Sequence, residues 1–119
     1  MPSLPERRLS LVQVVESPFC VAIDDGQRVH NEIADILDAG QIALVSFSGV
    51  KRLTTAFLNA AIGQLYNEYE EASIRERLRV TDATQQDLLL LKKVVDNAKF
   101  FFADPRRGTA ILKRLTGDA

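Results

Sequence analysis

The stretch from Leu53 to Asn67 contains no charged residue, and it constrains the fold more than any other part of the chain. Its apolar side chains recur at helical spacing, with Phe57, Ala61 and Leu65 along one line. A helix on the surface of a globular protein normally carries Lys or Glu on its solvent side. We therefore predict a helix that is either covered on most sides or held for a partner.

The flanking sequence predicts strands and further helices around this one. Turn residues at Asp24-Asp25-Gly26 and at Gly40 bound one helix, with an acid as its cap. Thr84 with Asp87 forms a capping-box variant that begins the last long helix. The buried face predicted for that helix consists of Leu88, Leu91, Val95, Ala98 and Phe102. The predicted strands are Leu9–Val15, Phe19–Ile23, Gln41–Phe47 and Leu78–Asp82, and a final short helix is predicted at Thr109–Leu115.

Strands that alternate with helices predict an α/β fold with right-handed crossovers and a mixed, mainly parallel sheet of four to five strands. The first two strands are expected to form an antiparallel hairpin. At 119 residues the chain is long enough for one small domain with a single core. We expect this single domain to span residues 1–119, with a loose N-terminal tail at 1–8 and a C-terminal extension at 105–119.

Charge, hydropathy and cysteine content indicate which partners and which cellular location to expect for such a domain. The formal net charge is −1, which gives no electrostatic reason to expect nucleic acid or a membrane surface as a partner. Residues Met1–Arg8 are polar, unlike a signal peptide, and no apolar run approaches the ~20 residues that cross a bilayer. The single cysteine, Cys20, excludes an internal disulfide, and its apolar neighbours favour a buried structural thiol over a reactive one. We therefore expect a cytoplasmic protein.

The residue types that most enzymes need do not occur together in this sequence. His30 is the only histidine, which excludes sites built on several imidazoles, and the helical phase predicts that it lies on the surface opposite Ile33. The segment Gly49-Val50-Lys51 lacks the leading glycine and the Gly-Lys-Ser/Thr ending of a phosphate-binding loop. We therefore predict that the protein is not an enzyme and uses no cofactor or metal.

Two charged clusters have both a functional and a structural interpretation. Asp24 and Asp25 either bind a metal ion or cap the following helix, and a pair of acids at a helix start is more typical of a cap. Arg106-Arg107 and Lys113-Arg114 either bind phosphate groups or form a solvated face. The solvated face is favoured, because no aromatic residue is interleaved to stack on bases.

Three amides and one glycine in the uncharged helix do not fit a simple core helix. Asn59, Gln64 and Asn67 either satisfy buried backbone groups or form the polar part of an interface. Gly63 costs roughly 1 kcal/mol relative to Ala in mid-helix, which indicates a close approach by another element. Packing against the last helix is favoured over contact with a partner's backbone or a second protomer.

Several segments resemble a bacterial family of STAS-like domains, known mainly as a domain of unknown function. The specific part is the run Phe57–Tyr66, FLNAAIGQLY, which follows Thr54-Thr55-Ala56. The other matching segments are Ser17–Val21, Ser46–Val50, and Asn97–Lys99 with Phe102. The resemblance covers most of the chain, roughly Leu9 to Pro105.

This resemblance implies the fold of anti-sigma-factor antagonists, with helices packed mostly on one face of the sheet. Such domains bind partner proteins: the loop after the central strand and the start of the next helix dock on a GHKL-type ATPase or serine kinase. Phosphorylation of a Ser or Thr at that helix start adds about two negative charges and breaks the contact. On this analogy the partner-binding residues are Ser48, Gly49, Lys51, Arg52, Thr54, Thr55, Leu58 and Asn59.

The chain departs from the antagonist pattern at three positions. Alignment on the Ser-Gly-Val turn places Ser46 at the strand-end acid, Thr54 at the second acid and Ala56 at the usual phosphoserine. Thr55 and Thr54 are then the candidate phosphoacceptors, and both also fit N-terminal helix capping, which is favoured. The alternative function is a structural or assembly domain that forms a homodimer through the uncharged helix, without a phosphorylation switch.

Overall fold

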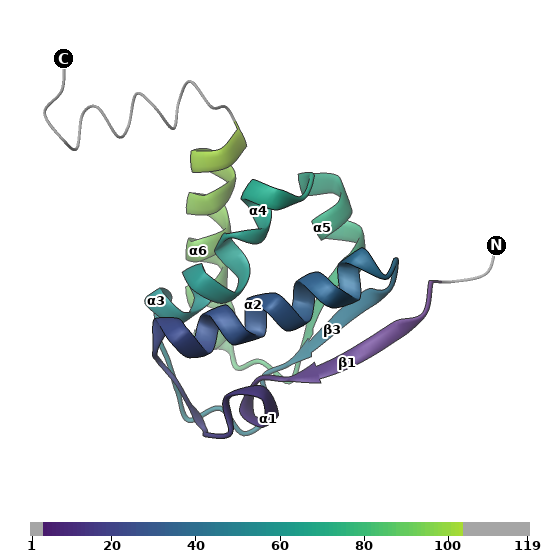
Figure 1. The fold of residues 1–119 in the computed structure, drawn as a ribbon. Helices are drawn as coiled ribbons and strands as arrows, with labels where there is room; N and C mark the ends of the chain where they lie inside the picture. Colours follow the sequence, from purple (N-terminus) through teal and green to yellow (C-terminus); the bar gives the residue numbers. More distant parts are fainter. Residues whose placement is uncertain (1–3, 104–119) are drawn as a thin grey trace, which may run out of the picture.

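The computed structural model describes residues 4–103, which form an α/β domain of alternating strands and helices (Figure 1). The strands are β1 (Glu6–Ser10), β2 (Phe19–Cys20), β3 (Ile42–Ser46), β4 (Arg52–Leu53) and β5 (Leu78–Thr81). The helices are α1 (Leu11–Val15), α2 (Ile23–Asp38), α3 (Thr55–Leu58), the π-helix η1 (Asn59–Gly63), α4 (Leu65–Glu68), α5 (Glu71–Arg77) and α6 (Gln85–Ala103). The predicted α/β class is confirmed.

The strands form two small sheets in which every described pairing is parallel. One sheet has the order β1-β3-β5, and the other consists of β2 and β4. β3 is the central strand, as predicted, and its residues are buried except for the half-buried Leu44. The predicted antiparallel hairpin of the first two strands is wrong, because β1 and β2 pair with different, later strands.

The N-terminal region folds differently from the prediction. Glu6–Arg8 belong to β1 and are not a loose tail. The predicted strand at Leu9–Val15 ends at Ser10, whose Oγ accepts a hydrogen bond from the backbone N–H of Gln13 and caps α1. α1 is helical in spite of its β-branched residues because Leu11 and Val15, one turn apart, both reach the core.

The core lies on one face of the larger sheet, beneath the helices. Leu9 of β1 and Val45 of β3 point toward Ile33 of α2 and Phe57 of α3 within one continuous apolar cluster. The opposite face carries the cross-strand row Arg8, Leu44 and Arg79, of which both arginines are exposed. The expected packing of helices mostly on one face is therefore confirmed.

Two details of α2 refine the predicted turn. The N-cap residue is Ala22, so Asp24 and Asp25 do not cap the helix but lie in its first turn, where negative charge complements the helix dipole. Asp25 Oδ1 accepts a hydrogen bond of 2.7 Å from Arg28. Gly40, with φ of 75°, ends the segment in the left-handed conformation that the sequence predicted.

The uncharged stretch is not one regular helix. It runs through α3, the π-helix η1 and α4, and η1 is marked by a hydrogen bond of 3.1 Å from the Gln64 N–H to the Asn59 carbonyl. A π-turn inserts one residue and rotates all later side chains by about 100° relative to an α-helix. The regular helical spacing of the apolar residues in the sequence does not indicate that insertion.

Backbone close approaches fix this stretch on both sides. A Cβ atom on Gly26 would lie 2.5 Å from the Phe57 carbonyl oxygen and 2.8 Å from Ala60 Cβ, so α2 touches the uncharged segment directly. On the other side, a Cβ on Gly63 would lie 3.5 Å from Val94 Cγ1 of α6. The favoured interpretation of Gly63, packing against the last helix, is confirmed.

The last helix begins as predicted, but its buried face differs. Thr84 Oγ1 accepts from the Asp87 N–H at 3.1 Å, and Asp87 accepts from the Thr84 N–H at 3.2 Å, which completes the capping box. Val94 and Ala98 are the buried positions of α6, whereas Leu88 is 47% exposed. α5 was not predicted, and the predicted helix Thr109–Leu115, the C-terminal extension and its basic clusters lie outside the described residues.

We expect Gly26→Ala to destabilise the protein by about 1–3 kcal/mol, because the added methyl group overlaps the Phe57 carbonyl. Gly→Ala within a helix normally stabilises by up to ~1 kcal/mol, so the sign of the change is diagnostic. Urea denaturation measures it. Gly40→Asn is the control, because Asn tolerates positive φ and nothing lies within 4 Å of that Cβ. A Gly26→Ala variant as stable as the wild type would contradict the close contact.

Candidate functional site

The segment that the sequence selected for partner binding forms one corner of the molecule, where the small β2–β4 sheet meets the start of α3. Gly49 has φ of 83° and turns the chain after β3. The Lys51 N–H then donates 2.8 Å to the Pro18 carbonyl, and β4 pairs with β2 so that Arg52 lies beside Phe19. Ser48, Gly49, Lys51 and Arg52 are all exposed, as a docking segment requires.

Thr54 connects this corner to the body of the domain. It is the N-cap of α3, and its Oγ1 accepts from the Phe57 N–H at 3.2 Å. The same hydroxyl donates 2.9 Å to the Val21 carbonyl, which lies in the loop before α2. Both hydrogen-bonding roles of this hydroxyl are in use, so Thr54 is a structural cap.

Thr55 differs from its neighbour. It is the first residue of α3 and is half-buried, and none of the hydrogen bonds within residues 4–103 involves its hydroxyl. A phosphate at this position would lie at a helix start, where backbone N–H groups favour negative charge. Of the two candidate phosphoacceptors, Thr55 alone has a hydroxyl whose modification leaves the cap intact.

The remaining predicted site residues separate into surface and core. Asn59 is exposed on the outer side of η1. Leu58 has 0% exposure and packs in the core, so its assignment to the binding surface is wrong. Helical phase alone did not distinguish the two, because the segment is covered on more than one side: α2 approaches it through Gly26 at Phe57 and Ala60, and Leu58 is also fully buried in the core.

Two apolar side chains that the sequence did not single out extend this surface. Ile23, at the start of α2, is 62% exposed, and Phe19 of β2 is 52% exposed. Ile23 also borders a shallow groove of about 490 Å³ between α2 and the uncharged helix. The groove is lined by Ile23, Gln27, His30, Ala56, Asn59, Ala60, Gln64 and Glu68. The sequence feature that could have predicted the exposure of Ile23 is its position directly before Asp24-Asp25-Gly26, at the start of the helix.

His30 lies at the floor of this groove and is only 7% exposed, so its predicted surface position is wrong. Its Nε2 lies 3.0 Å from Glu68 Oε1, and Gln27 Nε2 lies 3.3 Å from Nδ1. Nε2 therefore faces a carboxylate of α4, and Nδ1 faces amide groups of its own helix. His30 therefore joins α2 to α4, a contact that depends on the tertiary approach of two helices distant in sequence.

The three amides of the uncharged helix face outward. Asn59, Gln64 and Asn67 are exposed, and none of their side chains has a hydrogen-bond partner in the described part of the chain. This leaves them as the polar part of a surface and removes the alternative in which they satisfy buried backbone groups. They form a ridge with one groove on the α2 side and a smaller hollow, of about 240 Å³, on the α6 side.

A polar cluster joins the carboxyl ends of the three main strands. Ser46 Oγ donates 2.8 Å to Asp82 Oδ2, and Arg8 donates 2.9 Å to the same oxygen. Ser46 is 1% exposed, and Asp82 has a left-handed backbone with φ of 59°. The antagonist pattern has an acid at the position of Ser46. In this chain a carboxylate lies beside that position from Asp82, after β5, and Asp82 links the ends of the strands.

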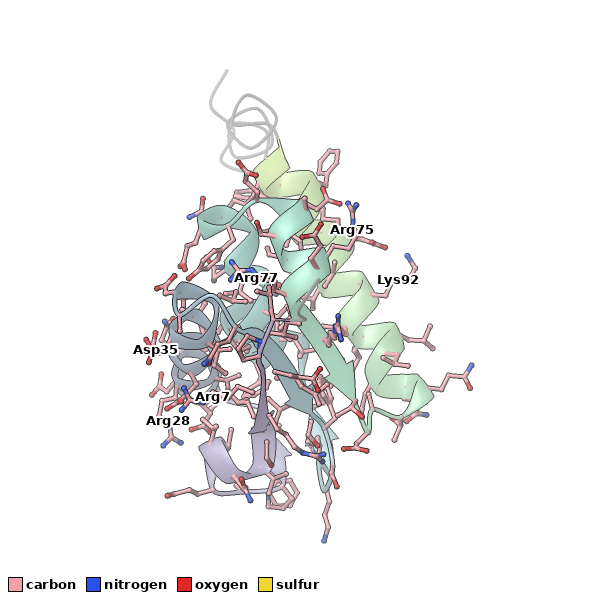
Figure 2. All side chains as sticks on the ribbon, turned by 90° about the vertical axis from the view of Figure 1, so that its right-hand side faces the viewer. Arg7, Arg28, Asp35, Arg75, Arg77 and Lys92 are labelled. Atoms are coloured by element: carbon pink, nitrogen blue, oxygen red, sulfur yellow. The ribbon has the colours of Figure 1, made fainter. Side chains whose placement is uncertain are left out.

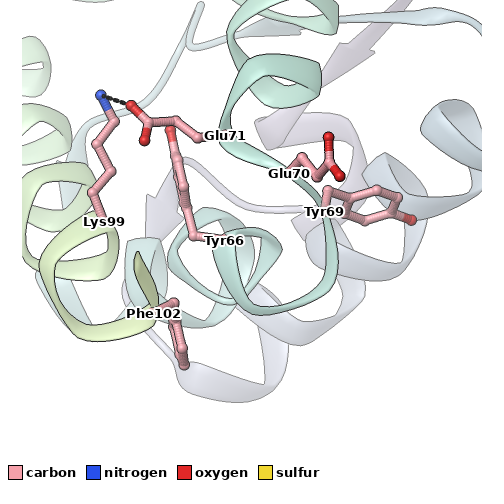
Figure 3. Close-up of a pocket in the computed structure, with 6 residues that line it drawn as sticks. All are labelled: Tyr66, Tyr69, Glu70, Glu71, Lys99 and Phe102. Carbon is pink, nitrogen blue, oxygen red and sulfur yellow. Dashed lines mark ion pairs between the residues drawn. The ribbon is translucent and has the colours of Figure 1, made fainter. Parts of the chain in front are cut away.

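A further hollow of about 300 Å³ lies at the far end of α6 and contains one ion pair (Figure 3). Lys99 Nζ lies 3.2 Å from Glu71 Oε1, and this ammonium lowers the pKa of Glu71. Burial, followed by a 2.6 Å hydrogen bond to Asp38, raises the pKa of Tyr69 to about 12. The Tyr69 ring points away from Tyr66, and Lys99 and Glu71 are paired with each other (Figure 3).

Cys20 is fully buried beside the docking corner, as the sequence favoured. Burial, assisted by the negative charges of Asp25 and Asp87, raises the pKa of its thiol to about 11. At neutral pH the thiol is protonated and has little nucleophilic character. Within residues 4–103, no three His, Cys, Asp or Glu side chains gather in a way that would hold a metal ion.

The structure is a small α/β domain with an exposed corner at the start of the helix that follows its central strand. The chain belongs to the STAS-like domain of unknown function (DUF4325), whose family model matches residues 25–88, slightly more than half of the chain. The match includes the part of the exposed corner from Ser48 to Asn59, but it leaves out β1, α1 and β2. Neither the curated proteins nor the solved structures include a significant match.

In the described region, none of the helices has the length and apolar character needed to cross a membrane.

We expect Thr54→Ala to lower the free energy of unfolding by about 1–2 kcal/mol, the usual cost of losing an N-cap. Thr55→Ala should change it by no more than about 0.5 kcal/mol, as is typical of a surface position without specific contacts. Thr54→Ser, which keeps the hydroxyl, serves as the matched control. Guanidinium denaturation of the variants gives the comparison, and equal losses at the two threonines would refute the division of roles.

Cys20 should react with a thiol reagent at pH 8 far more slowly than a free cysteine, because its thiol is buried and protonated. Its folded-state pKa exceeds the ordinary value of 9.0, so its contribution to stability is complete below pH 9 and is lost as the pH rises toward 11. Reaction with a chromogenic disulfide in buffer and in denaturant measures the difference. Rapid labelling of the folded protein would contradict the buried position.

Proposed function

We propose that this protein is a regulatory binding module that docks on a partner protein through the corner formed by β2, β4 and the start of α3. The observation that carries the proposal is the exposure of two large apolar side chains, Phe19 at 52% and Ile23 at 62%, on either side of Thr54-Thr55. Large exposed apolar side chains with polar residues around them are typical of protein interaction sites. Binding, and not catalysis, is the proposed activity, and no cofactor is needed for it.

The charge of the corner indicates the chemistry of the partner surface. Lys51 and Arg52 are exposed, and neither side chain has an ion-pair partner within the described chain. Arg52 lies next to Phe19 across the small sheet. A partner that places acidic groups around an apolar pocket would match this arrangement, with aromatic and Arg side chains as the expected hot spots.

The likeness to anti-sigma-factor antagonists supplies the class of partner. Those domains use the corresponding loop and helix start to bind a GHKL-type ATPase or serine kinase, so we propose a partner of that type in the bacterial cytoplasm. Thr55 is the proposed phosphoacceptor. A phosphate there would change the charge of the corner by about −2, which cancels the positive charge of Lys51 and Arg52.

The test is binding to a GHKL-type ATPase recovered from extracts of the source cell and then purified. Wild-type protein should bind it, and Thr55→Glu and Ile23→Asp should each weaken binding by about thirtyfold or more, as expected for hot-spot positions. Isothermal titration calorimetry measures the dissociation constants. Both variants should keep the stability of the wild type, since neither side chain belongs to the core.

Two controls place equivalent changes elsewhere on the surface. Ala72→Glu adds the same charge on exposed α5, and Leu4→Asp replaces another exposed apolar side chain, 48% exposed. Neither should alter binding. If no ATPase is recovered, or if Thr55→Glu and Ile23→Asp bind as tightly as the wild type, the docking corner is wrong. Self-association through the amide ridge of Asn59, Gln64 and Asn67 would then be the better proposal.

A further inference from the structure

The outer face of α6 contains a row of four residues that the docking corner does not use. Leu89, Lys93, Asp96 and Phe100 follow the 4-3-4 spacing that aligns side chains along one side of a helix. Leu89 is 63% exposed and Phe100 is 53% exposed. We call this row the α6 outer row.

The outer row lies on the side of α6 opposite the residues that are buried in the domain. Val94 and Ala98 are the buried residues of α6, and they lie on the opposite side of the helix from the row. In Figure 2, α6 forms one edge of the molecule and Lys92 projects outward from it. A partner approaching along this edge meets α6 before any other described helix.

The order of residues in the row is self-complementary. When two α6 helices lie antiparallel about a two-fold axis between positions 94 and 95, Leu89 of one copy faces Phe100 of the other. In the same arrangement Lys93 faces Asp96 of the second copy. Each apolar contact and each ion pair occurs twice, as the symmetry of an isologous interface requires.

An existing ion pair already orders the charged centre of the row. Lys92 Nζ lies 2.8 Å from Asp96 Oδ2 within one helix, which holds the carboxylate on the outer side of α6. In the antiparallel pair this carboxylate would lie between Lys92 of its own chain and Lys93 of the second copy. Opposite charges at the centre favour this register over shifted or parallel alternatives, in which like charges or mixed apolar and charged residues meet.

We propose that the protein forms a two-fold homodimer through antiparallel pairing of α6 along the outer row. The interface is distinct from the uncharged helix that the sequence offered for dimerisation. It contains no residue of the docking corner, so the dimer keeps two copies of that corner available to partners. A partner that is itself dimeric would then bind with avidity beyond that of a single contact.

The first measurement is sedimentation equilibrium of the full chain at concentrations up to about 100 µM, which covers the weak affinities expected of a small interface. The wild type should show a monomer–dimer equilibrium, and Leu89→Asp should weaken the dimer by about thirtyfold or more. Lys51→Asp is the control, an exposed charge change at the docking corner that should leave the dimer unchanged. Circular dichroism confirms that each variant is folded.

Charge exchange tests the register. Lys93→Glu and Asp96→Lys each create two repulsive contacts and should each weaken the dimer by about tenfold, and the double variant should recover most of the affinity. A mixture of Leu89→Cys and Phe100→Cys chains should form a mixed disulfide, since Cys20 is buried and does not compete.

Three results would overturn the proposal. A protein that remains monomeric at every concentration excludes the interface. If Leu89→Asp leaves the dimer intact, the dimer interface lies elsewhere. If Lys51→Asp abolishes the dimer, the interface includes the docking corner. Failure of the double charge exchange to recover affinity, together with no mixed disulfide, excludes the antiparallel register.

Discussion

The direct contact between α2 and the uncharged helix is the constraint on which the rest of this domain depends. Gly26 allows the α2 backbone to approach the Phe57 carbonyl so closely that no side chain fits between them. This approach brings the Gly26 position against Ala60 and places His30 Nε2 within 3.0 Å of Glu68 Oε1. A helix without a single charged residue is stable in this position because most of its surface is covered by α2 on one side and α6 on the other.

The same contact fixes the geometry of the docking corner. Thr54 caps α3 and also donates to the Val21 carbonyl, immediately before α2. The start of α3 and the start of α2 are therefore held together, and the exposed side chains of Ile23 and Phe19 take fixed positions beside Thr55. A binding surface mounted on two helix ends and a short sheet is pre-organised, so little conformational entropy is lost when a partner binds.

The two proposed surfaces of the molecule differ in chemistry. The docking corner combines apolar side chains with unpaired positive charge and suits a different protein with acidic groups. The outer row of α6 has both charge signs in a symmetric order and suits a second copy of itself. Because they share no residue, one surface can be occupied while the other remains open.

The sequence by itself determined the features that depend on local physical chemistry. The apolar run of β3, the left-handed Gly40, the capping box of Thr84 and Asp87, and the buried Cys20 all follow from residue type and spacing. The family likeness, carried by the run from Phe57 to Tyr66, was also readable. These features involve residues within one or two helical turns of each other, where sequence separation and spatial separation are nearly the same.

Tertiary structure decided the features that depend on which helices and strands pack against each other. The segment Leu11–Val15 contains three valines and is yet helical. Leu11 and Val15, one turn apart, both reach the core, and this burial outweighs the strand preference of the valines. The π-turn at Asn59–Gly63 and the burial of His30 and Leu58 occur where α2 and α6 pack against the same segment, a contact between elements far apart in the sequence. The site divides in the same way. The sequence located the exposed turn and favoured helix capping for both threonines, which is right for Thr54 and wrong for Thr55. Only the structure separated the two threonines and placed the exposed side chains of Ile23 and Phe19 beside them. Long-range packing selects among local alternatives because burying apolar area outweighs the fraction of a kcal/mol by which local propensities differ.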